Sequence, residues 1–321
     1  SESVTVNKVS TDTRTLEKGS MFIALRGERT DGHNFIKNAF DKGASVVVCE
    51  TPVVPPEECT VITVDDTIKA LKDMAKKYME TFRIPVVGIT GSVGKTTTKE
   101  MIAQILSTEY NVHKTMGNFN NHIGLPLSVL ELTHEHTAAV FEMGMSGLGE
   151  IEYLTDIIRP DIGVITNIGI SHIEKLGTRQ NILRAKLEIT KGMKENGKLI
   201  LNGDDELLSG LKGLLPMPLI FYGINETSDL NAFDIHSLGE DGVRFTVKLR
   251  NEDVDIALPA PGIHNVSNAL AAVACGLELN VSNENIKKGL ANYSQEKMRL
   301  NIVKYKNCIK IINDSYNSAP S

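Results

Sequence analysis

The stretch VVGITGSVGKTTTKEM, residues Val86–Met101, joins an apolar β-branched run to a glycine-containing turn, a lysine and three threonines. This order predicts a strand, a phosphate-binding loop and a helix. Such a loop turns backbone N–H groups inward, and the helix adds its positive N-terminal end. Lys95 can then reach the outer phosphates, while the hydroxyl of Thr96 can hold Mg²⁺. The stretch therefore predicts a nucleotide site.

The spacing departs from the long form of this loop, G-x-x-x-x-G-K-[ST]. The position five before Gly94 is Ile89, and the first glycine of the loop is Gly91. Glycine-rich turns between a strand and a helix also occur for packing alone. Gly-Lys-Thr directly after an apolar strand nevertheless favours nucleotide binding.

Outward from this loop, strands and helices alternate, which predicts an α/β fold with a mostly parallel, doubly wound sheet. The strand candidates are Val86–Thr90, Ala138–Met143, Ile162–Asn167, Lys198–Leu201 and Leu219–Tyr222. From residue 235 to 259 the rhythm changes, and we expect antiparallel strands added to the sheet. Helices are expected to resume at His264–Glu278 and Asn283–Tyr293.

A chain of 321 residues is too long for one ordinary core, so two or more domains are expected. Residues 1–82 form a small α/β unit by pattern. Its expected elements are Met21–Leu25, Phe35–Lys42, Ala44–Cys49 and Ile68–Met79. Arg83-Ile84-Pro85 follows as a linker, because Pro85 disfavours helix at the residue before it.

Composition narrows the class of protein. The formal net charge is −6 with both signs mixed along the chain, which gives no basic footprint for nucleic acid. No apolar run approaches the ~20 residues that cross a bilayer. The four cysteines are scattered and include no C-x-x-C pair, which suits a reducing compartment. We expect a cytoplasmic protein that neither binds nucleic acid nor inserts into a membrane.

Three further polar residues belong to the central part of the chain. Glu142 ends an apolar strand, where ligands of parallel sheets gather, and it is either a Mg²⁺ ligand or a solvated carboxylate. His172 lies in a loop and could ligate a metal, although a hydrogen-bonded surface histidine fits the bare residue better. Lys186 lies among charged neighbours, and by spacing alone it belongs to a solvated helix face.

Two asparagine clusters keep a structural and a functional interpretation open. Asn118, Asn120 and Asn121 suit a turn, and they also suit a site that contacts peptide carbonyls or phosphate oxygens. Asn265 and Asn268 open a helix of small residues. Asn265 is either an N-cap or a contact to adenine.

Together these residues resemble the Mur ligases, the ATP-dependent amide-forming enzymes of peptidoglycan synthesis, over nearly the whole chain. Thr90–Thr97 matches their shortened ATP signature, and the His-Asn-x-x-Asn run from 264 matches their adenine-side motif. His172 and Lys186 match the family's metal-binding histidine and its carbamate-carrying lysine. The resemblance implies ATP, two Mg²⁺ ions and a carbamate on Lys186.

The resemblance also implies the role of each site residue. The catalytic residues are Lys95, Glu142, His172 and Lys186, and the metal ligands are Thr96, Glu142, His172 and Lys186. The ATP-binding residues are Gly91, Ser92, Val93, Gly94, Lys95, Thr96, Thr97, Asn265, Asn268, Arg299 and Asp314. The substrate-binding residues are Thr13, Arg14, Asp31, Gly32, His33, Asn118, Asn120, Asn121 and Asn317.

Within the family, Glu142-Met143-Gly144 and Asn313–Pro320 resemble the members that join D-Ala-D-Ala to UDP-N-acetylmuramoyl-tripeptide. Ser10–Arg14 with Asp31-Gly32-His33 resembles the uridine-nucleotide end of the substrate site. Thr13 stands where serine is frequent, which keeps the hydroxyl. The implied partners are UDP-N-acetylmuramoyl-tripeptide, D-Ala-D-Ala and ATP, and the expected state is a monomer.

The implied domains are a UDP-substrate-binding domain at 1–82, a central ATP-binding domain at 83–298, and a linker at 299–321 where a C-terminal domain begins. Family members carry that third domain, and we expect it to be missing here, which leaves turnover by this chain open. Two alternatives remain. One is another ligase of the superfamily, either the tripeptide-forming Mur ligase or a folylpolyglutamate synthase. The other is a nucleotide- and substrate-binding module without turnover.

Overall fold

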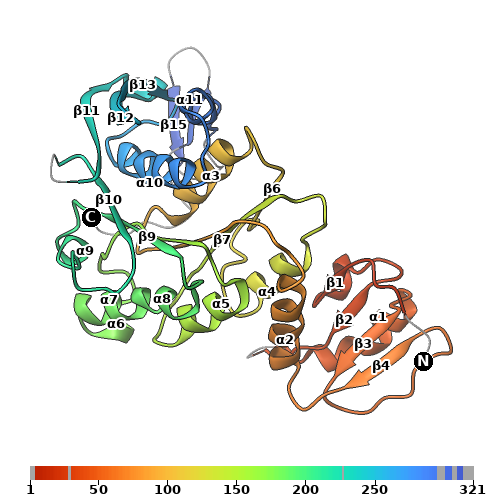
Figure 1. Ribbon diagram of the computed structural model, residues 1–321. Helices are drawn as coiled ribbons and strands as arrows, with labels where there is room; N and C mark the ends of the chain where they lie inside the picture. The colour runs from red at the N-terminus through yellow and green to blue at the C-terminus, as the bar shows by residue number, and fades with distance from the viewer. Residues whose placement is uncertain (1–3, 28–29, 226–227, 295–300, 306–308, 314–321) are drawn as a thin grey trace. The chain divides into compact units, whose positions relative to one another are not determined.

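The structure is a computed structural model that describes residues 4–27, 30–225, 228–294, 301–305 and 309–313 (Figure 1). The chain divides into two compact units. Unit 1 comprises Ser1–Arg83 and Met116–Thr133, and unit 2 comprises Ile84–Thr115 and His134–Ser321. Each unit combines helices with a largely parallel sheet, so the predicted α/β fold is confirmed.

Unit 1 is built on a parallel four-stranded sheet in the order β1-β2-β3-β4. The strands are β1 (Val9–Ser10), β2 (Met21–Ile23), β3 (Val46–Cys49) and β4 (Thr60–Thr63). The helices are η1 (Thr13–Thr15), η2 (Gly32–Phe35), α1 (Ile36–Asp41), α2 (Thr67–Met79) and α4 (Gly124–Leu130). Side chains of β3 alternate between two cores: Val47 packs with α1, whereas Val46 and Val48 pack with α2. Both faces of the sheet are therefore covered.

The segment 116–133 corrects the expected domain plan, which placed it in the central domain. In the structure α4 packs on the core of unit 1 through Ile123, Leu127 and Leu130. The hydroxyl of Tyr78 in α2 also donates a 2.7 Å hydrogen bond to the carbonyl of Leu132. The segment completes the face of the first sheet that α2 covers, and burial of its apolar side chains there explains why it leaves the central unit.

Unit 2 holds a nine-stranded sheet in the order β13-β12-β11-β10-β9-β8-β5-β7-β6. Its strands are β5 (Val86–Thr90), β6 (Val112–Lys114), β7 (Ala138–Glu142), β8 (Ile162–Ile165), β9 (Lys198–Asn202), β10 (Leu219–Gly223), β11 (Leu230–Ser237), β12 (Val243–Leu249) and β13 (Glu252–Leu258). Its helices are α3 (Lys95–Leu106), α5 (Glu150–Ile158), α6 (Ile173–Leu176), α7 (Arg179–Leu187), α8 (Ile189–Gly192), α9 (Glu206–Ser209), η3 (Gly239–Asp241), α10 (His264–Glu278) and α11 (Asn283–Ala291). A two-stranded antiparallel sheet of β14 (Asn301–Tyr305) and β15 (Ile309–Asn313) also belongs to this unit.

Two layers of helices cover the central sheet of unit 2. Val87 and Ile89 of β5 pack into a core with side chains of α3 and α10, which lie side by side in Figure 1. Gly88 faces the other way, where a Cβ atom would meet Met143 and Ile158. The buried β5 is thus an interior strand of a doubly wound sheet, which agrees with its near-continuous apolar sequence.

The antiparallel end of the sheet confirms an expectation and corrects its start. We expected the first added strand at Ile235, but β11 begins at Leu230 and pairs in parallel with β10. It then pairs antiparallel with β12 after a register shift between Phe233 and His236. Asp234 adopts a φ of 49° at this bulge. One strand therefore joins the parallel and antiparallel parts of the sheet.

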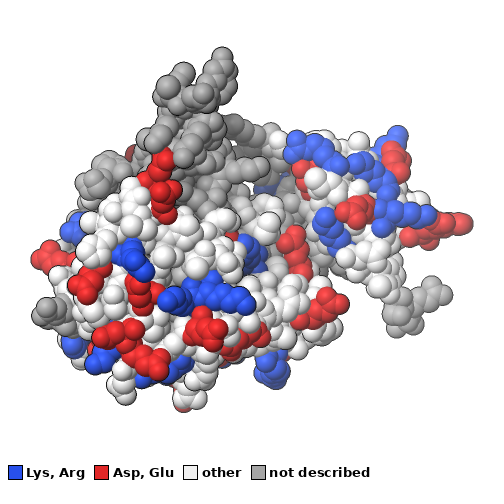
Figure 2. Space-filling model, turned by 90° about the horizontal axis from the view of Figure 1, so that it is seen from above, with Lys and Arg blue, Asp and Glu red and all other residues white. Residues whose placement is uncertain are grey.

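Charged side chains of both signs are mixed on the surface. On the face drawn in Figure 2, basic and acidic side chains are interspersed. Within the described part of the chain, no helix is both long and apolar enough to cross a membrane.

Candidate active site

The loop between β5 and α3 requires glycine at two positions. Gly91 has a φ of 154°, and a Cβ atom there would lie 1.8 Å from Oγ1 of Thr166. Gly94 caps α3 with a φ of 81°, and its Cβ would lie 2.6 Å from Oδ1 of Asn268. Any larger residue would open the loop or displace its neighbours. The predicted order of strand, loop and helix is observed with the expected bounds for the strand.

Residues after β8 brace this loop. The N–H groups of Ser92 and Val93 donate to the carbonyl and to Oδ1 of Asn167, at 3.1 and 3.0 Å. The hydroxyl of Thr166 donates to the carbonyl of Val93 at 2.6 Å, and Gly169 N donates to Oγ of Ser92 at 2.9 Å. These bonds use the amides of Ser92 and Val93, whereas the first N–H groups of α3 have no partner within the helix. The assignment of Ser92 and Val93 to ATP stays a prediction.

Lys95, Thr96 and Glu142 meet at the carboxyl ends of β5 and β7. The ammonium of Lys95 donates to the carbonyls of Gly91 and Ser92, at 2.8 and 3.3 Å, and so lies over the loop. The hydroxyl of Thr96 donates a 2.9 Å hydrogen bond to Oε2 of Glu142. Glu142 is only 2% exposed, which corrects the alternative of a solvated carboxylate. The sequence predicted this cluster, and the structure brings it together.

Lys186 corrects the simple interpretation drawn from its spacing. It lies on α7 but is 2% exposed, so it is not part of a solvated face. Burial, followed by the positive charge of Lys95, lowers the pKa of Lys186 well below that of an ordinary lysine. No carboxylate of the described residues forms an ion pair with it. A lowered pKa favours the neutral form of the amine, which is the form that reacts with CO₂.

His172 is exposed to solvent just before α6. Its backbone adopts the left-handed conformation, with a φ of 66°. Desolvation by the neighbouring protein atoms, followed by the positive charges of Lys186 and Lys95, lowers the pKa of His172. The lowered pKa favours the neutral imidazole, which is the form that ligates a metal. The same electrostatic influences place His172 in the field of the two site lysines. A strained backbone at a non-glycine residue agrees with a functional position.

The two asparagines of α10 are buried and bonded within the protein. Asn268 donates to Oδ1 of Asn265 at 3.1 Å and accepts from the hydroxyl of Thr98 at 3.2 Å. Asn265 donates to the carbonyl of Pro261 at 2.8 Å. The residue that caps α10 is Ile263, so the N-cap interpretation of Asn265 is wrong. The pair ties α10 to α3, and its contact with adenine stays a prediction.

Unit 1 contains a cavity of about 570 Å³ that gathers part of the predicted substrate site. Thr13, Arg14 and Gly32 line it, together with Ile123 of the segment that precedes α4. The guanidinium of Arg14 forms an ion pair with Asp12, at 2.6 Å from Oδ2. The same carboxylate caps η1. The hydrogen bond with Arg14 lowers the pKa of Asp12. An exposed arginine held at the rim of a cavity is suited to bind an anion.

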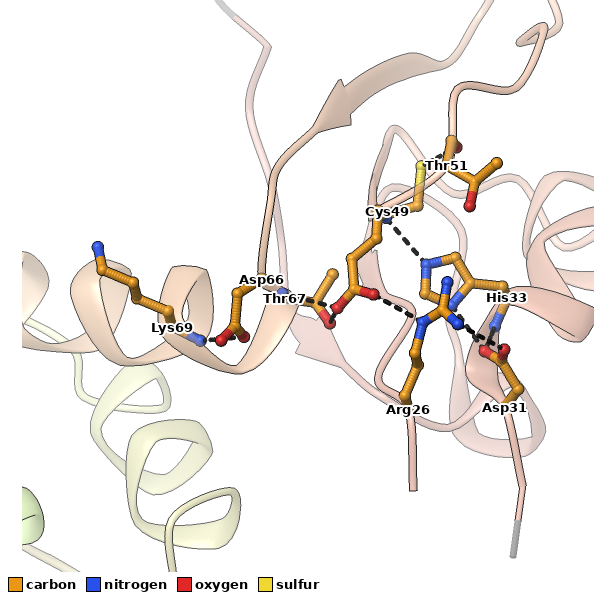
Figure 3. Close-up of polar contacts among 9 residues, drawn as sticks. Arg26, Asp31, His33, Cys49, Thr51, Asp66, Thr67 and Lys69 are labelled. Atoms are coloured by element: carbon orange, nitrogen blue, oxygen red, sulfur yellow. Dashed lines mark hydrogen bonds and ion pairs between the residues drawn. The ribbon is translucent and has the colours of Figure 1, made fainter. Parts of the chain in front are cut away.

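Asp31 and His33 lie beside this cavity in a polar network that Figure 3 shows. Nε2 of His33 accepts from the N–H of Glu50 at 2.9 Å, so the proton is on Nδ1, which donates to Asp31 at 2.7 Å. Both ring nitrogens are therefore used inside the protein. Glu50 also accepts from Arg26 at 2.6 Å and from the N–H of Thr67 at 3.1 Å. The sequence did not indicate Glu50 or Arg26, because their pairing spans 24 residues.

The remaining predicted residues are placed as follows. Oδ1 of Asn121 accepts from the N–H groups of Ile123 and Gly124, at 3.1 and 2.8 Å, which supports its turn interpretation. Asn118 is exposed and Asn120 is partly buried, and neither lines the cavity described above. Arg299, Asp314 and Asn317 lie outside the described residues.

Comparison with known proteins agrees with this arrangement. Residues 89–276 match the Mur ligase middle domain, and residues 5–79 match the catalytic domain of the Mur ligase family. The chain therefore belongs to the Mur ligase family, the ATP-dependent ligases of peptidoglycan precursor synthesis.

Three similar proteins are described by name. A protein of Bacillus subtilis named UDP-N-acetylmuramoyl-tripeptide–D-alanyl-D-alanine ligase is 46% identical over 321 residues, which are all of this chain and 69% of that protein. A crystal structure of MurF from Acinetobacter baumannii has a TM-score of 0.91 at 36% identity, over 98% of this chain and 68% of that one. MurF ligase from Thermotoga maritima in complex with ADP has a TM-score of 0.86 at 30% identity, over 97% and 71%.

Proposed function

We propose that this chain catalyses the joining of D-Ala-D-Ala to UDP-N-acetylmuramoyl-tripeptide at the expense of ATP. The observation that carries the proposal is the group of Lys95, Thr96 and Glu142 at the end of a braced phosphate loop. The buried Lys186 and the exposed His172 both lie within the electrostatic influence of Lys95. The names of the relatives support the choice of substrates.

The chemistry requires that the tripeptide carboxylate be activated. A carboxylate oxygen is a poor leaving group, so transfer of the γ-phosphoryl of ATP to it gives an acyl phosphate and ADP. The amine of D-Ala-D-Ala then attacks the carbonyl carbon, loses a proton and expels phosphate. Phosphoryl transfer between two anions depends on positive charge and alignment. Lys95 and the first-turn amides of α3 supply both.

Two metal positions fit the donor groups. Within the described residues, no three His, Cys, Asp or Glu side chains form a metal cluster, yet Mg²⁺ uses few protein ligands and completes its shell with phosphates and water. The adjacent oxygens of Thr96 and Glu142 would hold one ion. A carbamate on Lys186, with neutral His172, would hold a second. When bound, the two ions neutralise the phosphates and the acceptor carboxylate.

We assign the UDP end of the substrate to the cavity of unit 1. Arg14, whose guanidinium is paired with Asp12, would contact the diphosphate there, and Thr13 offers a hydroxyl. Asp31 and His33 act by holding the wall of the cavity, because both ring nitrogens of His33 are already bonded. The expected monomeric state stays a prediction.

The test is a phosphate-release assay with ATP, Mg²⁺, UDP-N-acetylmuramoyl-tripeptide and D-Ala-D-Ala. The matched controls replace the dipeptide by a single amino acid, or the substrate pair by folate and glutamate. Phosphate release only with UDP-N-acetylmuramoyl-tripeptide and D-Ala-D-Ala supports the proposal, whereas turnover of either control pair contradicts it. If no pair turns over, binding of Mg·ADP and of the UDP-tripeptide is measured separately. Binding of both supports the non-turning-over alternative.

A further inference from the structure

Thr96 and Lys99 lie three residues apart on α3 and therefore share one face of the helix. Thr96 contacts the carboxylate of Glu142 directly. Lys99 is completely buried, and its ammonium donates a 2.8 Å hydrogen bond to the carbonyl of Thr115. A lysine with no exposed surface is rare unless its charge has a structural or chemical use. The role of Lys99 therefore depends on what Thr115 does.

Thr115 connects this helix to the backbone of Glu142. β6 ends at Lys114, which is level with Val140 of β7, so no strand residue of β6 lies opposite Glu142. The hydroxyl of Thr115 fills that place, because it accepts a 3.1 Å hydrogen bond from the N–H of Glu142. The Thr115 N–H meanwhile donates to the carbonyl of Val140 at 3.1 Å. The Thr115 side chain thus supplies the hydrogen bond that a further residue of β6 would otherwise make to Glu142, the predicted metal ligand.

The charge of Lys99 is balanced inside the protein. Its ammonium lies 3.0 Å from Oε1 of Glu100, and Glu100 is also paired with Lys114. Burial alone would raise the pKa of Glu100, but the hydrogen bond to Lys114 and the charge of Lys99 lower it. Glu100 is therefore ionised at neutral pH and forms an ion pair with Lys99. A charged donor makes a stronger hydrogen bond to the Thr115 carbonyl than a neutral one would.

We infer that Thr115 and Lys99 are positioning residues that fix Glu142 as a ligand of the nucleotide-bound Mg²⁺. α3 would then define the geometry of the metal site twice, through the Thr96 hydroxyl and through the Lys99–Thr115–Glu142 chain. Groups that orient a metal ligand change metal affinity by 10- to 100-fold when they are removed, on the order seen at other metal sites. The inference rests on the proposed use of Mg·ATP.

The experiment measures the affinity for ADP by calorimetry, once in excess Mg²⁺ and once in EDTA. The dissociation constant in EDTA divided by the dissociation constant in Mg²⁺ reports how much the metal strengthens binding. Thr115→Val removes the acceptor hydroxyl at nearly constant shape, and we expect it to lower this ratio by about tenfold while the affinity in EDTA stays unchanged. Thr115→Ser retains the hydroxyl and should keep the wild-type ratio. Lys99→Met should lower the ratio from the helix side.

Thr137→Val is the matched control, because the hydroxyl of Thr137 accepts from the N–H of Asn111 at 2.9 Å just before the other end of β7. It should keep the wild-type ratio. A wild-type ratio in Thr115→Val or in Lys99→Met overturns the inference, as does an equal loss of affinity in EDTA, which indicates a merely structural role. If thermal unfolding shows that the Thr115→Val chain is not folded, the ratios of Lys99→Met and Thr115→Ser decide the inference. If the wild-type chain shows no metal-dependent binding, the proposed function itself fails.

Discussion

The hydroxyl of Thr96 donates a 2.9 Å hydrogen bond to Oε2 of Glu142, across 46 residues of sequence. Thr96 lies in the first turn of α3, and Glu142 ends the neighbouring strand β7. Two hard oxygen donors thus stand beside the positive end of a helix whose first residue is Lys95. That combination favours a phosphate group together with its magnesium ion.

Lys95→Ala should weaken the binding of Mg·ADP while the fold stays intact. A hydrogen bond to a charged group contributes about 1.5–3 kcal/mol, so we expect a loss of at least about tenfold in affinity. Calorimetric titration measures it, and thermal unfolding checks the fold. Lys287→Ala, which changes an exposed lysine on α11, is the control. Equal affinities for the wild-type chain and Lys95→Ala would exclude Lys95 from the phosphate site.

Gly32→Ala should damage the cavity of unit 1. A Cβ atom at Gly32 would lie 2.7 Å from the carbonyl oxygen of Leu25, which is backbone and cannot move aside. Overpacking of this kind costs about 1–3 kcal/mol, and we expect weaker binding of the UDP-tripeptide with unchanged binding of Mg·ADP. Gly210→Ala, where the nearest atom would be 3.4 Å away, is the control. Parental affinity for the UDP-tripeptide in Gly32→Ala would remove the UDP end from this cavity.

Glu50→Ala should destabilise the chain in a pH-dependent way. The hydrogen bond from the N–H of Thr67 lowers the pKa of Glu50, since the carboxylate accepts the first N–H of α2 and so adds to the cap formed by Asp66. A lowered pKa in the folded state adds stability above the unfolded value of about 4.3, and that stability is lost as the pH falls through the folded value. Loss of a cap costs about 1 kcal/mol.

Urea titrations at pH 7 and pH 3 measure the effect as the difference in free energy of unfolding between wild type and variant. The difference should be present at pH 7 and shrink at pH 3. Glu58→Ala, at an exposed loop position, is the control and should show no difference at either pH. A destabilisation of Glu50→Ala that is equal at both pH values would mean that the ionised cap is not its cause.

The sequence predicted those parts of the fold that local chemistry determines. An apolar run followed by Gly-Ser-Val-Gly-Lys-Thr needs no distant partner to specify strand, loop and helix, and Val86–Thr90 and His264–Glu278 are observed with their predicted bounds. Short strands such as Val9–Ser10 and Thr60–Thr63 were not predicted, since two to four residues carry no period. The contact of residues 116–133 with unit 1 was also missed, because an apolar helix does not encode which sheet it covers.

The site was predicted to a similar extent. Family motifs indicated Lys95, Glu142 and Lys186, but they did not indicate Thr115 or Lys99, whose roles depend on hydrogen bonds across 16 and 27 residues. Spacing suggested that Lys186 is solvated, since its neighbours on α7 and α8 are charged. Only the packing of α7 shows that one side chain of this charged group points into the protein.

Lys186→Met should stabilise the chain and abolish its function. Burial, followed by the charge of Lys95, lowers the pKa of Lys186, so folding is penalised at any pH where the unfolded lysine is charged. Methionine has no such penalty, and we expect the Tm of the Lys186→Met chain at pH 7 to be about 3 °C above that of the wild type. The gain should shrink as the pH approaches about 10.4, the unfolded value.

The measurement is calorimetric unfolding between pH 7 and 10 in buffers depleted of CO₂, because a carbamate would remove the charge by another route. Lys175→Met, at an exposed position on α6, is the control and should show no gain.

In the ligation assay Lys186→Ala should lose activity, and a short carboxylic acid should restore part of it by occupying the vacated oxygen positions. Mass spectrometry or a ¹³C signal for a carbamate on the wild-type chain identifies the modification directly. A Lys186→Met chain with wild-type stability and wild-type ligation would show that the amine is neither strained by burial nor used.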